Sequence, residues 1–143
     1  MPAMRSERLP VLEKTSVPDA PLFLHSRLGS GSFGVVYSAI NTLQLRRCAV
    51  KVIKSSARAE HEVAMQARVK GLPGVVSHHA TYFWGDLTLM EMVKCPGGTL
   101  AEYMLGGLYF RNNIGLRHHY LQILSAAKFC HQKGVYHCDI KPQ

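Results

Sequence analysis

The fold of this chain is decided by the stretch Gly29-Ser30-Gly31-Ser32-Phe33-Gly34-Val35-Val36. In dinucleotide-binding folds, glycines spaced G-x-G-x-x-G open a helix whose N-terminus holds the pyrophosphate. Here the β-branched and aromatic run Val35-Val36-Tyr37 follows the last glycine, which favours a strand. No Gly-Lys-Ser/Thr follows, so the stretch is not a Walker loop. We predict a glycine hairpin between two strands. Its backbone N–H groups can approach phosphate oxygens because glycine has no Cβ, although an ordinary hairpin would show the same glycines.

The segments around this hairpin predict an antiparallel sheet with one helix. Ser55-Ser56 is placed to cap a helix. That helix ends near Val69 or Lys70, because Gly71 suits a helix terminus. The predicted strands, marked by apolar alternation or β-branched runs, are residues 21–28, 35–40, 47–53, 75–84 and 87–92. The pattern is α+β, built on a five-stranded antiparallel sheet.

After a linker near residues 94–98, the sequence becomes mainly helical. Thr99 and Glu102 have the spacing of a capping box, which predicts a short helix. A longer helix should end at Gly134, and Val135-Tyr136 has the composition of a short strand. The apolar residues that recur at helical spacing in the longer helix are Leu116, Tyr120, Ile123, Leu124, Ala127 and Cys130.

A lysine stands on the third predicted strand, in Ala49-Val50-Lys51. The following helix offers two carboxylates to pair with it, Glu60 and Glu62. Two residues along a helix are about 200° apart, so only one of them can face Lys51. Periodicity alone does not choose between them, and a surface lysine would give the same strand pattern.

The strongest motif is His137-Cys138-Asp139-Ile140-Lys141-Pro142, which resembles the protein kinase catalytic loop H-R-D-x-K-P. Together with the glycine hairpin and the lysine, it gives three ordered motifs at kinase spacing. The chain therefore resembles the serine/threonine protein kinase family from about Leu22 to Gln143. The resemblance implies a protein-kinase-like fold that includes the N-terminal lobe and the first helices of the C-terminal lobe.

The resemblance also implies roles for individual residues. Asp139 would orient the substrate hydroxyl and accept its proton, and Lys141 would contact the transferring phosphate. Lys51 would bridge the α- and β-phosphates of ATP, held by Glu62, because Glu62 fits the family spacing better than Glu60. The nucleotide would contact Leu28, Gly29, Ser30, Gly31, Ser32, Phe33, Gly34, Val36, Ala49, Met92, Val93 and Cys95.

Within that set, Met92 matches the residue guarding the back pocket without a gap. Met90 is the alternative if the linker holds an insertion, and core packing suits either methionine. Backbone groups of about Val93 to Cys95 would hydrogen-bond adenine.

Two departures from the family pattern matter. Cys138 replaces the catalytic-loop arginine, and the sequence ends at Gln143, one position before the expected metal-binding asparagine. We expect the Mg²⁺ ligands, this asparagine and D-F-G, beyond residue 143, and we name no metal ligand within the chain. Without them we expect little or no phosphoryl transfer.

A cysteine at position 138 cannot make the bidentate phosphate contact of arginine. Control of the enzyme by activation-loop phosphorylation should therefore not act through residue 138.

Composition limits the classes of partner. The chain has 143 residues and a hydrophobic content of 47%, which suits a globular protein. Its net charge of +8 is spread along the sequence without a basic run, so we do not expect nucleic acid as a partner. The four cysteines show no metal-ligand spacing, and no apolar run is long enough to span a bilayer. We expect a cytoplasmic or nuclear protein whose partners are ATP and a protein substrate with Ser or Thr.

These observations predict a flexible N-terminal tail, residues 1–20, followed by a partial kinase domain, residues 21–143. The domain would consist of an N-terminal lobe (21–92), a hinge (93–98) and part of a C-terminal lobe (99–143). The expected function is ATP-dependent phosphorylation of protein serine or threonine. The alternative is a truncated or pseudokinase-type module that binds nucleotide or a partner without catalysis.

Overall fold

The computed structural model describes residues 9–106 and 113–142, and the chain divides into two compact units. The first unit contains the residues up to Val63 together with His79–Lys94. The second contains Ala64–His78 and the residues from Cys95 onward. All the strand residues except His78 therefore belong to the first unit.

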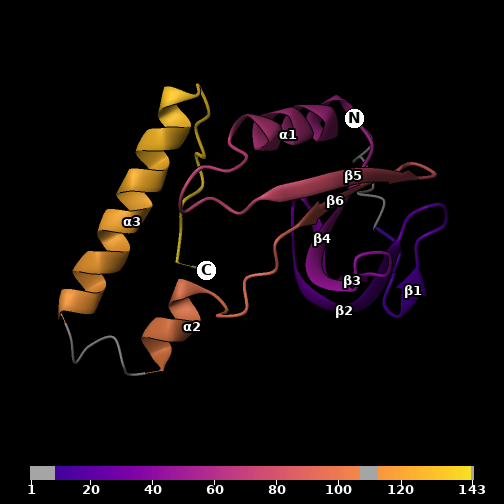
Figure 1. Ribbon diagram of the computed structural model, residues 1–143, viewed down its shortest axis with the longest axis horizontal. Coiled ribbons are helices and arrows are strands. Elements are labelled where there is room, and N and C mark those ends of the chain that lie inside the picture. The colour runs from indigo at the N-terminus through magenta and orange to yellow at the C-terminus, as the bar shows by residue number, and fades with distance from the viewer. Residues whose placement is uncertain (1–8, 107–112, 143) are drawn as a thin grey trace, which may run out of the picture. The chain divides into compact units, whose positions relative to one another are not determined.

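Six strands form one curved sheet, in the order β1-β2-β3-β4-β6-β5 (Figure 1). The strands β1 to β4 pair antiparallel with their neighbours in sequence, and β4 pairs antiparallel with β6. This confirms the predicted antiparallel sheet. The sixth strand is the two-residue β1, which pairs with β2. The bounds are β1 Thr15–Ser16, β2 Leu22–Gly31, β3 Gly34–Asn41, β4 Arg46–Lys54, β5 His78–Trp84 and β6 Leu87–Met92.

The main core of the first unit lies on one face of this sheet. Alternate residues of a strand point to opposite faces, so Val50 and Val52 of β4 are buried at 0% and 1% exposure, while Lys51 between them points to the other face. Burial of such aliphatic side chains is the principal stabilising term of the unit, at roughly 1.5–3 kcal/mol each. The core cluster also contains Leu12, Val17, Leu22, Leu24, Tyr37, Ala39, Cys48, Leu87 and Leu89.

The opposite face of the sheet packs against the helix α1 (Ala57–Arg68). Ile53 and Met90 are buried there against Ala59 of the helix. The helix begins as predicted, because the Ser56 hydroxyl accepts a hydrogen bond from the Ala59 N–H at 3.2 Å. Lys51 therefore lies on the same face of the sheet as the helix.

The N-terminal segment 9–20 belongs to the fold, so the predicted flexible tail is wrong for these residues. The rest of that prediction, residues 1–8, lies outside the described residues. Leu12 and Val17 are 6% and 4% exposed and lie in the core cluster. The N–H of Leu12 donates to the hydroxyl of Tyr37 at 3.2 Å. These contacts join residues far apart in sequence, so local composition does not reveal them.

Two helices belong to the second unit, α2 (Leu100–Leu105) and α3 (Asn113–Gln132). The predicted capping box of α2 is present: the Thr99 hydroxyl accepts from the Glu102 N–H, and the Glu102 carboxylate accepts from the Thr99 N–H. Gly134, with φ at +71°, follows α3 as predicted. The short strand predicted at Val135-Tyr136 is wrong, because these residues pair with no strand.

A buried polar cluster links four strands inside the first unit. The Glu91 carboxylate is 1% exposed and accepts hydrogen bonds from Arg46, Asn41 and Tyr82, at 2.7, 3.2 and 3.2 Å. Burial favours a higher pKa for Glu91, but these three donors outweigh it and hold the pKa below its usual value. Burial, reinforced by the Glu91 charge, raises the pKa of the Cys48 thiol to about 11. The three hydrogen-bond donors thus replace the water that the Glu91 carboxylate loses on burial.

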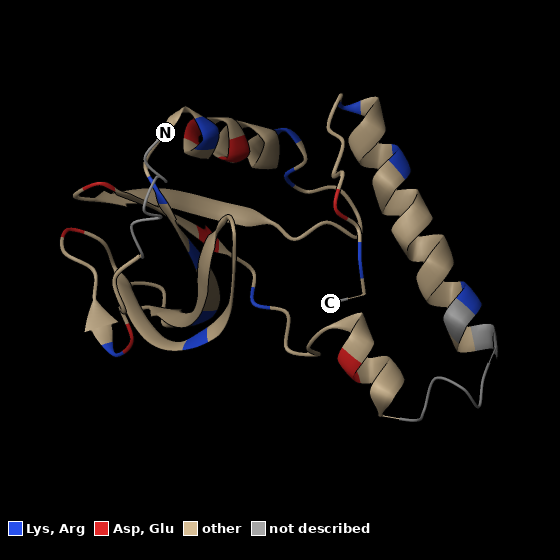
Figure 2. Ribbon diagram, turned by 180° about the vertical axis from the view of Figure 1, so that it is seen from behind, with Lys and Arg blue, Asp and Glu red and all other residues tan. Residues whose placement is uncertain are grey.

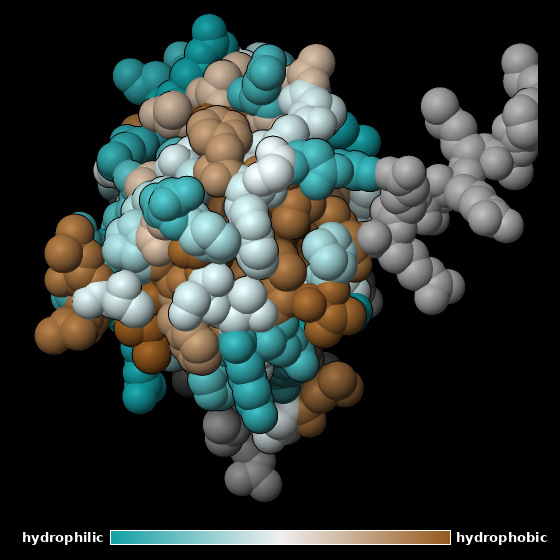
Figure 3. Space-filling view, turned by 90° about the vertical axis from the view of Figure 1, so that its right-hand side faces the viewer, coloured by the Kyte–Doolittle hydropathy of each residue, from teal (hydrophilic) through white to brown (hydrophobic). Residues whose placement is uncertain are grey.

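Basic residues are distributed over both units and are not gathered on one element (Figure 2). Figure 3 views the molecule from the right-hand side of Figure 1 and shows hydrophobic side chains in separate groups, with polar ones between them. Among the helices of residues 9–106 and 113–142, none combines the length and apolar character needed to cross a membrane.

Candidate functional site

The glycine hairpin connects β2 and β3, with Gly31 opposite Gly34 across the turn. Gly34 has φ at +134°, and a Cβ there would lie 2.5 Å from both Ile53 Cγ2 and the Val52 carbonyl oxygen of β4. Only glycine fits such a close approach. A Cβ at Gly29 or Gly31 would meet no atom within 4 Å. These two glycines therefore face open space, where a ligand can approach their backbone.

Lys51 of β4 forms an ion pair with Glu62 of α1 through Nζ and Oε1. The side chains are 21% and 33% exposed, so the pair is partly shielded from water. Glu60 is exposed on another side of the helix. This is the pairing predicted from the sequence. The pair holds the Lys51 ammonium group in place on the same face of the sheet as Ala49.

Two of the residues predicted to contact the nucleotide, Val36 and Ala49, lie on that face of the sheet, since Val36 stands opposite Lys51 in the strand register. Ala49 is 8% exposed and Leu28 is 51% exposed. Strand register puts Met92 opposite Ala49 and Met90 opposite Lys51, so both methionines share the face. Met90 is 1% exposed and packs toward α1, whereas Met92 is partly buried. The assignment of Met92 as the guard of the back pocket stays a prediction.

The predicted hinge is only partly within the first unit. Val93 is 42% exposed, and Lys94 donates from Nζ to the hydroxyl of Ser38 on β3 at 2.8 Å. Cys95 is exposed and belongs to the second unit. The hydrogen bond of Lys94 ties the start of this segment to the sheet, a contact that the sequence did not predict.

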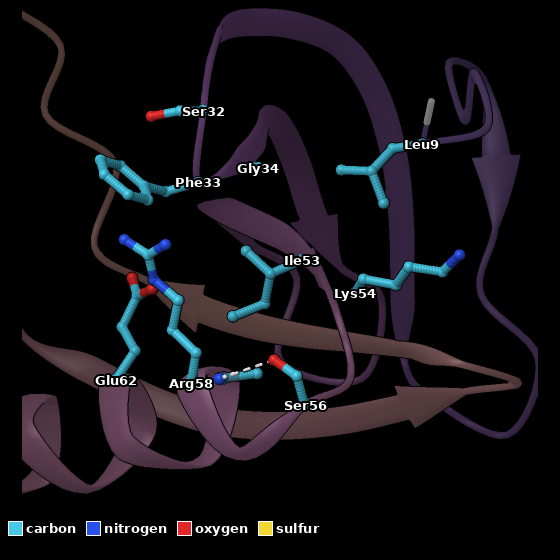
Figure 4. A pocket seen from close by; sticks show the side chains of 10 residues that line it. Leu9, Ser32, Phe33, Gly34, Ile53, Lys54, Ser56, Arg58 and Glu62 are labelled. Atoms are coloured by element: carbon cyan, nitrogen blue, oxygen red, sulfur yellow. Dashed lines mark hydrogen bonds between the residues drawn. The ribbon is translucent and has the colours of Figure 1, made fainter. Parts of the chain in front are cut away.

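A pocket of about 240 Å³ lies between the hairpin tip and the start of α1 (Figure 4). In Figure 4, Arg58 and Glu62 both rise from the helix toward Phe33. The guanidinium carbon of Arg58 lies 4.1 Å from the centre of the Phe33 ring, which is a cation–π contact. Leu28, Val36 and Ala49, which are predicted to contact the nucleotide, do not line this pocket. Its lining residues are Leu9, Ser32, Phe33, Gly34, Ile53, Lys54, Ser56, Arg58, Ala59 and Glu62.

Arg58 is the site residue that sequence reasoning missed. It precedes Glu62 by four positions, so both side chains share one face of α1. That spacing was visible in the sequence, but nothing local indicated that Phe33, far away along the chain, would stack on it.

The catalytic-loop motif lies in the second unit. The Asp139 N–H donates to Nδ1 of His137 at 3.1 Å, and Lys141 Nζ lies 3.2 Å from Asp139 Oδ2. The side chains of Asp139 and Lys141 are 58% and 54% exposed. The Ala101 N–H donates to the Pro142 carbonyl at 2.8 Å, which joins the end of this segment to α2. The loop thus presents a carboxylate and an ammonium group side by side.

Cys138 has a left-handed backbone, with φ at +61°. This conformation costs a non-glycine residue roughly 1–2 kcal/mol. Its thiol is exposed and contacts the Tyr136 carbonyl at 3.7 Å. Among the described residues, no group of three His, Cys, Asp or Glu side chains is arranged to hold a metal ion.

Comparison with known proteins agrees with this arrangement. Residues 23–143 match the family model "Protein kinase domain". The chain is 31% identical over 126 residues to the "Negative regulator of sexual conjugation and meiosis" of Schizosaccharomyces pombe, a match covering 82% of this chain and 27% of that protein. It is 35% identical over 124 residues to the "Serine/threonine-protein kinase dkf-1" of Caenorhabditis elegans, covering 81% and 17%. It is 33% identical over 141 residues to "CBL-interacting protein kinase 20" of Oryza sativa subsp. japonica, covering 92% and 30%.

The chain therefore spans less than a third of the length of these three relatives. The family match covers most of the chain and includes the hairpin, the lysine–glutamate pair and the catalytic-loop motif. The chain belongs to the protein kinase family.

Proposed function

We propose that this chain supplies the ATP-binding part and the catalytic aspartate of an enzyme that phosphorylates serine or threonine in proteins. The observation that carries the proposal is the ion pair between Lys51 and Glu62, beside a glycine hairpin with two sterically open glycines. An ammonium group fixed by a carboxylate can hold the α- and β-phosphates of ATP without first being ordered. Family membership supports the reaction class.

The second unit supplies the groups for the chemical step. The Asp139 carboxylate is suited to orient a substrate hydroxyl and accept its proton. Lys141, 3.2 Å from Asp139, is suited to neutralise charge on the transferring phosphoryl group. Magnesium, when bound, would neutralise charge on the phosphates of ATP.

Binding is tested by calorimetric titration of the 143-residue chain with ATP and with adenosine. Lys51→Met should weaken ATP binding at least about tenfold, because it removes the phosphate-binding cation. Adenosine, which has no phosphates, should bind the variant and the wild type alike. Lys70→Met is the matched control, because Lys70 is exposed and does not line the pocket at the hairpin. Equal ATP affinity in Lys51→Met and the wild type would contradict the proposal.

The second candidate is a module that binds nucleotide or a partner without catalysis. The observation in its favour is the replacement of the catalytic-loop arginine by Cys138. Phosphoryl transfer by the full-length protein, compared with its Asp139→Asn variant, separates the two functions. Transfer well above that of the variant supports the enzyme, while ATP binding with equal background transfer supports the binding module.

A further inference from the structure

The tip of the glycine hairpin is held from outside the sheet by one side chain of α1. Arg58 stacks its guanidinium on Phe33, with Cζ 4.1 Å from the ring centre. Phe33 stands between Ser32 and Gly34 at the turn and is 45% exposed, so its ring is not anchored in the core. The Arg58 contact therefore supplies a support for the ring that the core does not provide.

The helix that carries Arg58 also carries Glu62, one turn later on the same face. Glu62 pairs with Lys51, the predicted phosphate-binding cation. One face of α1 thus makes two contacts with the nucleotide half of the site, an ion pair to β4 and a cation–π contact to the hairpin tip. A shift of the helix would disturb both contacts together.

We propose that Arg58 is a positioning residue, which orders the tip of the glycine hairpin for ATP phosphates by stacking on Phe33. The inference rests on the proposed function, since it assumes that the hairpin covers phosphates. A tip that is already ordered does not have to lose conformational freedom when ATP binds, so the contact strengthens binding. Adenosine does not reach the tip, so its affinity is independent of the contact.

A charge effect would give a different result. If Arg58 acted only as a cation that attracts ATP, the Phe33 ring would be irrelevant. Phe33→Leu keeps the charge and removes the ring, whereas Arg58→Met removes the charge and keeps an apolar stem. If the two residues act through their contact, the double variant is no worse than the more affected single variant.

The experiment measures ATP and adenosine affinities for wild type, Arg58→Met, Phe33→Leu and the double variant by calorimetry. Each single variant should weaken ATP binding about two- to fivefold, as expected for a cation–π contact at the surface. Adenosine affinity should not change. Arg58→Lys, which keeps a cation over the ring, should restore most of the ATP affinity. Arg68→Met is the matched control, because Arg68 is exposed in the last turn of the same helix.

Hydrogen exchange of the backbone amides of residues 30–36, without nucleotide, provides a second measurement. These amides should exchange faster in Arg58→Met and Phe33→Leu than in wild type and Arg68→Met. If wild type binds no ATP, the proposed function fails, and this exchange still decides whether Arg58 orders the tip. Unchanged exchange in both variants overturns the inference. Additive losses of ATP affinity also overturn it, because they indicate that Arg58 and Phe33 act independently of each other.

Discussion

In the first unit, the largest core side chains are almost fully enclosed, with Leu24 and Leu89 both at 0% exposure. In the second unit, the helix α3 leaves Tyr120 and Leu124 at 61% and 59% exposure. Of the described residues in the second unit, Val69 and His78 alone are buried. The sheet thus has its own core, whereas α3 leaves much of its apolar face in contact with water. The comparison predicts that most of the stability of the chain comes from the first unit.

The largest effect should come from the core of the first unit. Leu24→Ala should reduce the free energy of unfolding by about 3 kcal/mol, because it leaves a cavity in an enclosed site. Leu124→Ala in α3 should change it by less than about 0.5 kcal/mol, because that side chain is largely exposed. Urea unfolding can be followed by the fluorescence of Trp84, the single tryptophan, which packs against the core cluster. Similar losses in both variants would refute the contrast between the units.

The next largest effect concerns the buried carboxylate of the first unit. Glu91→Gln should destabilise the unit by about 2 kcal/mol at pH 7, since it leaves Arg46 without its charged partner. We place this loss below that of a fully buried pair because Arg46 is 39% exposed. The same Trp84 fluorescence reports the change.

Acid should remove the difference between Glu91→Gln and the wild type. The pKa of Glu91 is lower in the folded than in the unfolded state, so its contribution is complete above the unfolded pKa of about 4.3. The contribution is lost as the pH falls through the folded pKa. Unfolding at a series of pH values should therefore show a gap that is constant from pH 7 to 5 and shrinks below about pH 4. A constant gap down to pH 3 would mean that the Glu91 charge does not stabilise the fold.

The smallest effect should appear in the catalytic loop of the second unit. Cys138→Val should destabilise the loop by about 1 kcal/mol, because β-branched residues tolerate positive φ poorly. Cys138→Asn should be neutral or slightly stabilising, since asparagine accepts the left-handed region. Hydrogen exchange of the amides around residues 135–142 measures both. Faster exchange in the asparagine variant than in the valine variant would contradict the backbone argument.

Much of the first unit could be predicted because its signals are local. The hairpin and the Ser56 cap each depend on a few adjacent residues with a definite conformational preference, as does the capping box of α2 in the second unit. The choice of Glu62 over Glu60 needed the family resemblance as well, since helix geometry only showed that one of the two could face Lys51.

The features that could not be predicted depend on long-range contacts. Leu12 lies in a segment without periodicity and is buried in a core cluster of residues that are distant in sequence, among them Tyr37. Glu91 looked like an ordinary strand residue, and its donors Asn41, Arg46 and Tyr82 come from three other strands. Sequence patterns report local preference and facing direction, but they do not report which distant side chain completes a hydrogen-bond set.

The glycines of the hairpin have one further consequence, for tolerance to natural variation. Gly34 is required by the packing of β4, whereas Gly29 and Gly31 are sterically unconstrained in the free protein. A library of variants selected only for folding should therefore reject side chains at position 34 and accept small ones at positions 29 and 31. Selection for nucleotide binding should reject any side chain at all three positions. Within this single motif, glycine at position 34 would then be required for folding, whereas glycine at positions 29 and 31 would be required for ligand binding.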